Sequence, residues 1–170
     1  MKKLNFGCGR DIKPKKEGWV NVDVQKGEGI DKSFNFENFP YPFKDNTFDY
    51  VLIKEVLEHM IDIKLVMNEL WRIGKKDAII EVFVPYWNHS AAHNAPDHKH
   101  CFNKRTFEVI CEKDTQAEIN PENKFELIEI ELIPTRMKRI FPVFILNFLD
   151  RFLHGIFIGI KAKIKIKKGL

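Results

Sequence analysis

The sequence has few cysteines and no long apolar run. Its three cysteines lie far apart, at Cys8, Cys101 and Cys111. Cysteines so few and scattered exclude a small disulfide-stabilised fold and fit a reducing cytoplasm. No stretch of about 18 uncharged apolar residues is present, so a membrane-spanning helix is not expected. The start, Met1-Lys2-Lys3, precedes too few apolar residues for a signal peptide. Length predicts one domain over residues 1–170.

Acidic residues are scarce in the C-terminal part of the chain. Residues 136–170 contain nine lysines or arginines and one acid, Asp150, which gives them a net charge of +8. The whole chain carries +4, so residues 1–135 carry −4. This asymmetry points to an anionic partner, which can be a membrane, a nucleic acid or a phosphorylated substrate. A solvated basic face is the alternative.

The N-terminal residues predict a strand that runs into a glycine turn. Residues 3–6 lead directly into Gly7-Cys8-Gly9. Glycine permits a positive φ and lets a ligand approach the main chain closely. A second expected strand, Trp19–Asp23, ends in a carboxylate. Strand, glycine turn, strand and carboxylate are typical of a nucleoside-binding site, in which the acid accepts hydrogen bonds from ribose hydroxyls.

Expected strands and helices alternate along the chain, which indicates an α/β fold with a mainly parallel sheet. The expected strands after the second one lie near residues 29–35 and at 48–53, 78–84, 125–133 and 158–168, and the expected helices at 61–73 and 104–112. The last strand alternates isoleucine or alanine with lysine, which predicts a half-exposed strand at or near a sheet edge. Residues 136–157 are apolar and aromatic and have helical capacity, with Pro142 near their start.

A long polar loop, residues 86–103, holds four of the six histidines, at His89, His93, His98 and His100. Loops of this length in a compact domain are commonly functional. This one follows an expected central strand, at the edge where open α/β sheets bind ligands. Imidazole titrates near neutral pH and can serve as a general base. Solvated or substrate-contacting histidines are the alternative. The spacing fits no structural zinc pattern, so no metal site is predicted.

Several motifs of the chain occur in the order seen in a known family. Leu4-Asn5-Phe6-Gly7-Cys8-Gly9 is similar to a glycine motif, and Asn21-Val22-Asp23 to the acidic end of a second strand. Residues 43–51, F-K-D-N-T-F-D-Y-V, and then Val56-Leu57-Glu58-His59 are similar to P-F-x-D-N-x-F-D-x-V and V-L-E-H signatures. Over about residues 3–110 the chain therefore resembles the class I S-adenosylmethionine (SAM)-dependent methyltransferases, specifically the small type 11 group.

The resemblance implies a Rossmann-like three-layer α/β sandwich. Its sheet is mainly parallel and has seven strands, of which the C-terminal one is antiparallel. Residues 136–157 form an apolar insertion before that last strand. SAM is the implied cofactor and S-adenosylhomocysteine the product. The implied cofactor-binding residues are Asn5, Phe6, Gly7, Cys8, Gly9, Asp23, Val24, Asn35, Phe36, Lys54 and Glu55.

His98 and His59 are the candidate general bases, needed only where the acceptor is a weak nucleophile such as a hydroxyl. Asp97 or Glu58 could orient the imidazole. For His59, a structural role at the start of a helix is the alternative.

The chain departs from the family at several positions. The family commonly has an acid at the position of Asn5 and a third glycine at that of Asp11. Only nine residues separate the glycine turn from the second strand, so the usual first helix is expected to be very short or absent. Asn35-Phe36 stands where an Asp-hydrophobic pair commonly lies beside the adenine, and the asparagine carbonyl can still accept a hydrogen bond there. These departures bear on cofactor affinity.

Other functions are weaker predictions. A nicotinamide-dependent oxidoreductase is disfavoured because Ile12 occupies the last position of G-x-G-x-x-G and the βαβ spacing is short. A nucleic-acid-binding protein or nucleic-acid methyltransferase would use the basic C-terminus, which lacks aromatic–basic interleaving. The acceptor can be a small molecule, a glycan or a lipid-linked compound. Residues 140–157 are expected in the core or a lid, in a homodimer contact, or at the membrane of an otherwise cytoplasmic protein.

Overall fold

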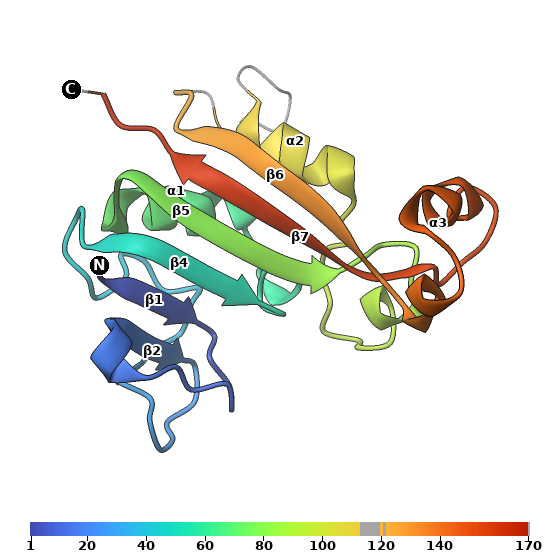
Figure 1. Ribbon diagram of the computed structural model, residues 1–170. Coiled ribbons are helices and arrows are strands. Elements are labelled where there is room, and N and C mark those ends of the chain that lie inside the picture. Colours follow the sequence, from blue (N-terminus) through green and yellow to red (C-terminus); the bar gives the residue numbers. More distant parts are fainter. Residues whose placement is uncertain (113–119, 121, 170) are drawn as a thin grey trace.

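The computed structural model describes residues 1–112, 120 and 122–169. One sheet organises the molecule, with its strands in the order β3-β2-β1-β4-β5-β7-β6 (Figure 1). Strands β1 to β5 are paired in parallel, and β7 runs antiparallel to both β5 and β6. The strands are β1 (Lys3–Phe6), β2 (Trp19–Asp23), β3 (Lys32–Ser33), β4 (Phe48–Lys54), β5 (Gly74–Pro85), β6 (Phe125–Pro134) and β7 (Phe157–Ile166). This confirms the predicted Rossmann-like sheet with its antiparallel C-terminal strand.

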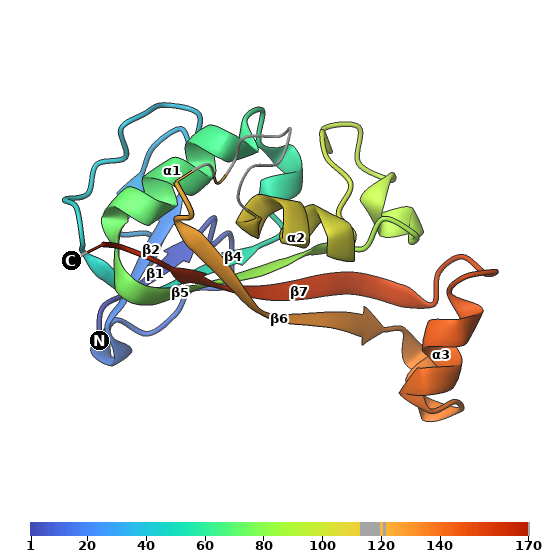
Figure 2. The same ribbon diagram turned by 90° about the horizontal axis from the view of Figure 1, so that it is seen from above.

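The helices α1 and α2 lie on the same face of the sheet (Figure 2). The α-helices are α1 (Ile63–Ile73), α2 (Lys104–Cys111) and α3 (Val143–Leu149), and the 3-10 turns are η1 (Lys15–Glu17), η2 (Leu57–His59), η3 (Ser90–Ala92) and η4 (Arg136–Arg139). Helix α1 begins after Asp62, whose carboxylate accepts a hydrogen bond from the Leu65 amide at 3.0 Å, and leads directly into β5 at Gly74. Between β1 and β2 only the three-residue turn η1 is present, as the short spacing predicts.

The core lies between the sheet and helices α1 and α2. Strand register places Leu4, Val51, Ile80 and Ile164 side by side across β1, β4, β5 and β7, and all four are fully buried. The buried face of α1 contributes Val66, Met67, Leu70 and Ile73 to the same cluster. Each fully buried aliphatic side chain contributes about 1.5–3 kcal/mol, so this layer fixes the strand order and the edge on which the loops meet.

The alternating strand β7 lies one strand in from the sheet edge, which β6 forms. Ile160, Ile164 and Ile166 face the core, and the lysines face the other side of the sheet, where they pair with acids of β5 and β6. The ion pairs are Lys161–Glu81 at 3.0 Å, Lys163–Glu129 at 2.7 Å and Lys165–Glu126 at 2.7 Å. The predicted half-exposed alternation is confirmed. The lysines are nevertheless cross-strand partners and do not protect a free edge.

Two expected elements differ in extent. The strand expected near 29–35 is the two-residue β3, because Gly29 adopts a positive φ before it and Asn35 opens a turn by accepting the Glu37 amide at 2.9 Å. The apolar stretch 136–157 forms η4 and then α3, with Pro142 at the N-cap of α3. Proline suits that position because its fixed φ is compatible with a helix start and it lacks the amide hydrogen that a helix interior requires.

Arg72 of α1 holds the irregular loop 37–46 against the helix. Its guanidinium contacts Glu69 and Asp45, each at 2.7 Å, and donates to the carbonyls of Phe43 at 2.8 Å and Tyr41 at 3.0 Å. Burial alone would raise the pKa of Glu69, but hydrogen bonds from Arg72 and from the Tyr41 amide hold that pKa below its usual value. A loop with two prolines and no regular structure is thereby fixed next to the core.

Candidate cofactor and active site

A cavity of about 390 Å³ lies at the carboxyl ends of β1, β2 and β4. Its walls come from the glycine turn, the end of β2, Phe36, the segment 55–60 around η2, and the histidine loop, residues 86–103. They consist of Gly7, Gly9, Asp23, Val24, Phe36, Glu55, Val56, His59, Met60 and Asp97. An adjoining depression over residues 25–30 shares Gly9 and Asp23 with it. The cavity therefore occupies the edge at which open α/β sheets bind ligands.

Gly7 and Gly9 both have positive φ values, +72° and +49°. The amides of Gly7 and Cys8 each donate to the Val22 carbonyl at 2.9 Å, which ties the turn to β2. A Cβ at Gly7 would lie 2.3 Å from a Val56 methyl, whereas a Cβ at Gly9 would meet nothing within 4 Å. The turn is therefore packed tightly on one side and open on the cavity side.

Asp23 joins the end of β2 to this turn. One carboxylate oxygen accepts from the Gly9 amide at 2.7 Å and the other from the Gln25 amide at 3.1 Å. An ionised carboxylate offers about four lone-pair sites, so both oxygens can accept further hydrogen bonds from a ligand. The acid is thus both a structural clamp on the turn and an available acceptor at the cavity wall.

Asn5 lies behind the turn and does not line the cavity. Its buried side-chain amide donates to the Asp11 carbonyl at 2.8 Å and to the Asn21 side chain at 3.0 Å. Asn21 in turn accepts from the Lys13 amide at 2.9 Å and donates to the Lys13 carbonyl at 2.8 Å. These two asparagines fix the chain between β1 and β2 where the related proteins are expected to have a helix.

Of the remaining predicted cofactor residues, some line the cavity and the others lie outside its walls. Phe36 lines the cavity and stacks on the fully buried Phe6, with ring centroids 3.9 Å apart. Cys8 is buried, and burial together with the charge of Asp23 raises its thiol pKa to about 11. Asn35 and Lys54 are exposed and do not belong to the walls of this cavity. Six of the eleven predicted residues therefore line it: Gly7, Gly9, Asp23, Val24, Phe36 and Glu55.

The histidine loop is bound to the start of η2. The Lys99 amide donates to the Glu58 carbonyl at 2.7 Å, and the Lys99 ammonium donates to the His59 carbonyl at 2.6 Å. The rings of His59 and His98 lie 4.7 Å apart in a T-shaped arrangement. Nδ1 of His59 is 3.0 Å from a carboxylate oxygen of Asp97, at an ion-pair distance without hydrogen-bond alignment. The structure thus brings both predicted histidines together, with His59 in the cavity wall.

Two other histidines of the loop, His89 and His93, have contacts within the loop. His93 contacts the Trp87 carbonyl through Nε2 at 2.9 Å, and His89 accepts from the Ala91 amide at 3.0 Å. Neither belongs to the walls of the cavity. These two histidines therefore contribute contacts within the loop, whereas Nε2 of His100 is buried and has no hydrogen-bond partner among the described residues.

The burial of Glu58, which is predicted only as a residue that could orient an imidazole, is the feature of the site that sequence patterns missed. This residue is 1% exposed, and neither carboxyl oxygen has a hydrogen-bond partner among the described residues. Burial, with the nearby charges of Glu55 and Asp97, raises the pKa of Glu58 to about 7. The only sequence signal was its place before His59, which could not reveal that the carboxyl is enclosed.

The strand order, the antiparallel last pair of the sheet and a glycine turn beside a carboxylate define the class I SAM-dependent methyltransferase fold. Residues 17–82 match a family model described as a methyltransferase domain, the type 11 model that the motifs predict. Residues 17–82 are therefore similar to a SAM-dependent methyltransferase domain, a family that uses SAM as its cofactor. A comparison with curated proteins gave no match.

Solved structures of the same fold cover nearly the whole chain. A SAM-dependent methyltransferase from Archaeoglobus fulgidus is 19% identical, with a TM-score of 0.68 over 98% of this chain and 86% of that one. The YcgJ protein from Bacillus subtilis is 15% identical, with a TM-score of 0.63 over 99% and 92%. Phosphoethanolamine N-methyltransferase 2 from Haemonchus contortus, in complex with SAM, is 16% identical, with a TM-score of 0.64 over 99% and 50%.

The walls of the cavity fit the cofactor. An amide-rich turn open on the cavity side suits close approach of a ligand to the main chain, and Asp23 supplies acceptors for paired hydroxyls. Phe36 supplies an apolar surface for a base. When bound, SAM supplies an activated methyl group.

Proposed function

We propose that the protein transfers the methyl group of SAM to an acceptor held at the carboxyl edge of the sheet. The observation that carries this proposal is the positive-φ turn Gly7-Cys8-Gly9, clamped by the Asp23 carboxylate at the wall of a cavity. The Gly7 and Gly9 backbone and Val24 border the cofactor, Asp23 accepts from the ribose, and Phe36 borders the adenine, with the exposed Asn35 next to it outside the cavity wall. Asn5, Phe6 and Cys8 support the turn from behind. Glu55 borders the methionine end, with the exposed Lys54 next to it outside the cavity wall.

His59 and His98 are proposed as the general base for an acceptor with a weakly nucleophilic hydroxyl. His59 is the better placed of the two because it lines the cavity and Asp97 lies 3.0 Å from its Nδ1. An orienting carboxylate favours the tautomer whose Nε2 can accept a proton. Positioning the acceptor next to the methyl group supplies most of the remaining rate enhancement, of the order of 7–11 kcal/mol at best.

Calorimetry with SAM, S-adenosylhomocysteine and NAD tests the cofactor site. We expect S-adenosylhomocysteine to bind and NAD not to bind. Asp23→Ala should weaken S-adenosylhomocysteine binding by about 1–3 kcal/mol, roughly 5- to 150-fold, because charge-assisted contacts to the ribose are lost. Asp23→Asn keeps one acceptor for the Gly9 amide, so its affinity for S-adenosylhomocysteine should lie between those of the parent protein and Asp23→Ala. Unchanged affinity in folded Asp23→Ala protein would remove Asp23 from the site.

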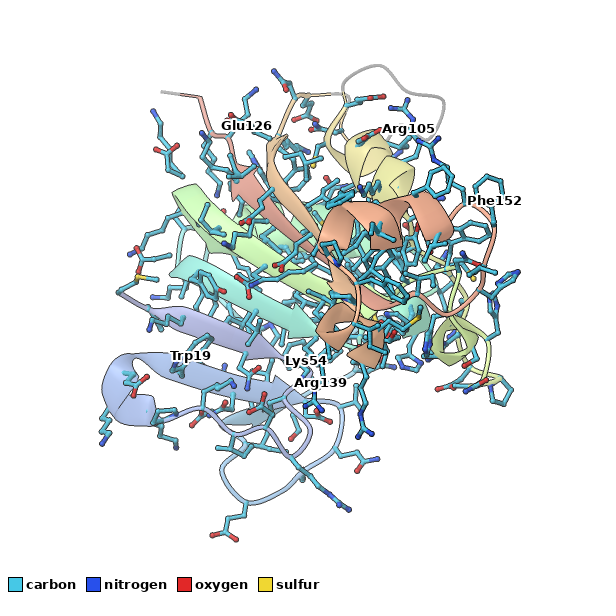
Figure 3. The ribbon with its side chains drawn as sticks, turned by 45° about the vertical axis from the view of Figure 1, so that its right-hand side comes forward. Trp19, Lys54, Arg105, Glu126, Arg139 and Phe152 are labelled. Carbon is cyan, nitrogen blue, oxygen red and sulfur yellow. The ribbon has the colours of Figure 1, made fainter. Side chains whose placement is uncertain are left out.

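The acceptor is proposed to be a small molecule or a glycan- or lipid-linked compound, and residues 140–157 to contact either a membrane or a second copy of the chain. Helix α3 stands out from the end of the sheet (Figures 1 and 2). Phe144, Phe148 and Phe152 follow one another at helical spacing and are 73%, 60% and 71% exposed. Exposed Arg139 and Arg151 flank them (Figure 3 labels Arg139 and Phe152).

A membrane surface is the contact that this composition favours. Aromatic side chains next to arginines suit the interface of an anionic bilayer. Among the described residues no helix is both long and apolar enough to cross a membrane, so α3 would lie in the interface. Its segment is tied to the histidine loop, because the Tyr86 hydroxyl donates to Asp150 at 3.0 Å and the Gly155 amide to the Asn88 carbonyl at 2.9 Å. A lipid-linked acceptor would then lie near the site.

Phe144→Ser/Phe148→Ser should reduce co-sedimentation with phosphatidylserine-containing vesicles at least about tenfold, because each buried phenylalanine contributes about 1.5–3 kcal/mol. The matched control Ile61→Ser/Leu65→Ser removes two exposed apolar side chains near α1 and should leave vesicle binding unchanged. Equal vesicle binding by both variants, or a dimer of the parent protein that only the first variant dissociates, would favour contact with a second copy.

The nucleic-acid alternative has less support than the sequence indicates. Three of the C-terminal lysines, Lys161, Lys163 and Lys165, are already paired with acids of β5 and β6. They are less available for phosphate groups than a free basic strand would be.

A further inference from the structure

Three side chains next to the cavity form a cluster of metal-ligand type. Glu58 and His59 come from η2, and His98 comes from the histidine loop. One ligand atom of each, a carboxylate oxygen or an imidazole nitrogen, lies within 4.8 Å of the others. An ion bound at about 2.0–2.2 Å holds its ligand atoms at most about 4.4 Å apart, so binding would draw these side chains slightly closer together, to within that limit.

The buried carboxyl of Glu58 indicates that something is bound there. It is 1% exposed and has no hydrogen-bond partner among the described residues for either oxygen. Buried polar groups are nearly always paired, because an unpaired one costs several kcal/mol. The nearest groups of suitable chemistry are the two imidazoles. A cation shared with them would satisfy the carboxylate.

The surroundings of the two histidines leave each with a nitrogen available to such an ion. Nδ1 of His59 faces Asp97 at 3.0 Å, and Nδ1 of His98 lies 3.2 Å from the Ala92 carbonyl. The Ala92 carbonyl at Nδ1 of His98 holds the proton there and leaves Nε2 free to bind a metal, which is the usual arrangement behind metal-binding histidines. Nδ1 of His59 is buried and has no hydrogen-bond partner among the described residues.

We infer that Glu58, His59 and His98 bind one divalent transition-metal ion, of the Zn²⁺, Mn²⁺ or Fe²⁺ class. With the ion bound, neither imidazole serves as the general base, so the two roles belong to the metal-bound and the metal-free protein respectively. Two imidazoles and one carboxylate suit these ions, whereas Mg²⁺ and Ca²⁺ prefer ligand sets made wholly of oxygen. Three protein ligands leave at least one coordination position open toward the cavity, where His59 forms part of the wall. Asp97 acts as a positioning residue for His59.

Metal titration of chelator-treated protein tests this inference without any methyl transfer. We expect one equivalent of Zn²⁺ by elemental analysis, a visible absorption band on adding Co²⁺, and a rise in melting temperature. Mg²⁺ at the same concentration should give no rise. Binding weaker than millimolar, or an effect of Mg²⁺ equal to that of Zn²⁺, would overturn the assignment.

Four variants locate the ion. Glu58→Gln, which is isosteric, and His98→Ala, at a partly exposed position, should each lower Zn²⁺ affinity at least about 100-fold, and Asp97→Asn about 10- to 100-fold. The matched control is His93→Ala, because His93 and Cys101 lie 3.9 Å apart and form the other metal-prone pair of the loop. If His93→Ala no longer binds its one equivalent of Zn²⁺ while Glu58→Gln and His98→Ala still bind it fully, the proposal is overturned.

The cofactor site is tested separately by S-adenosylhomocysteine calorimetry on the metal-free protein. Cofactor binding without metal binding overturns the metal site alone. Metal binding without cofactor binding supports the metal site and removes the proposed methyl transfer.

Discussion

Gly7→Ala is expected to lower the free energy of unfolding by about 2–5 kcal/mol. A side chain at the φ of +72° costs about 1–2 kcal/mol. Its Cβ would also lie 2.3 Å from a methyl of Val56, which is buried and β-branched and therefore restricted in its rotamers. Overpacking of this kind adds about 1–3 kcal/mol. Urea denaturation followed by circular dichroism measures the change.

Gly9→Ala is the matched control for Gly7→Ala. Its φ of +49° carries the same left-handed penalty, about 1–2 kcal/mol, but its Cβ would meet nothing within 4 Å. It should therefore stay folded and instead weaken S-adenosylhomocysteine binding, because its Cβ would project on the open side of the turn. Equal destabilisation by the two variants would show that Val56 moves aside and that the tight packing under Gly7 is not a constraint.

The central sheet and the cofactor edge could be predicted because their signals are local. The residues 48–53 form an almost continuous apolar run, as strands buried on both faces do, and the glycine turn follows its strand directly. The carboxylate at Asp23 lies at the end of a short strand that pairs with the first in parallel. Because parallel strands end at the same edge, these local features were sufficient to assemble the main part of the site.

The features that could not be predicted from the sequence depend on contacts between distant segments. The hydrogen bond between Asn5 and Asn21 exists only because β1 and β2 pair with these two residues in register. Sequence spacing predicted a missing helix but not what replaces it. The burial of Glu58 likewise depends on the histidine loop folding back, through the bond from the Lys99 amide. A one-dimensional pattern contains neither the register nor the loop closure.

The cofactor edge of the sheet is thus present, but the glycine turn at this edge is supported by a short irregular segment and not by a helix. A helix after the glycine turn usually stabilises that turn by packing, whereas here two side-chain amides and one carboxylate hold it by hydrogen bonds. Hydrogen bonds of this kind contribute only about 0.5–1.5 kcal/mol each, or about 1.5–3 to a charged group. The geometry of the turn consequently depends on neighbouring loops as well, above all on the loop that Arg72 fixes.

Arg72→Ala is expected to lower the free energy of unfolding by about 2–4 kcal/mol. Removing one partner of a buried ion pair costs about 3–5 kcal/mol, and the partial exposure of Arg72, 24%, reduces this. The loss leaves Glu69, only 13% exposed, without its cation. Arg72→Lys keeps the charge but cannot reach all four acceptors, and should lose about half as much. The measurement is urea denaturation at pH 7.

Arg72→Ala should also weaken cofactor binding, because the loop that Arg72 fixes, residues 37–46, holds Phe36 in the cavity wall next to the proposed adenine position. Arg72 donates to the Tyr41 carbonyl, and the Tyr41 hydroxyl donates to the Phe36 carbonyl at 3.0 Å. Releasing the loop therefore frees Phe36 from its stack on Phe6. Arg105→Ala on α2 is the control, since Arg105 also pairs with two acids but is 60% exposed, and it should change neither stability nor affinity measurably. If Arg72→Ala binds S-adenosylhomocysteine as tightly as the parent protein, the Phe36 wall is held by the aromatic stack alone.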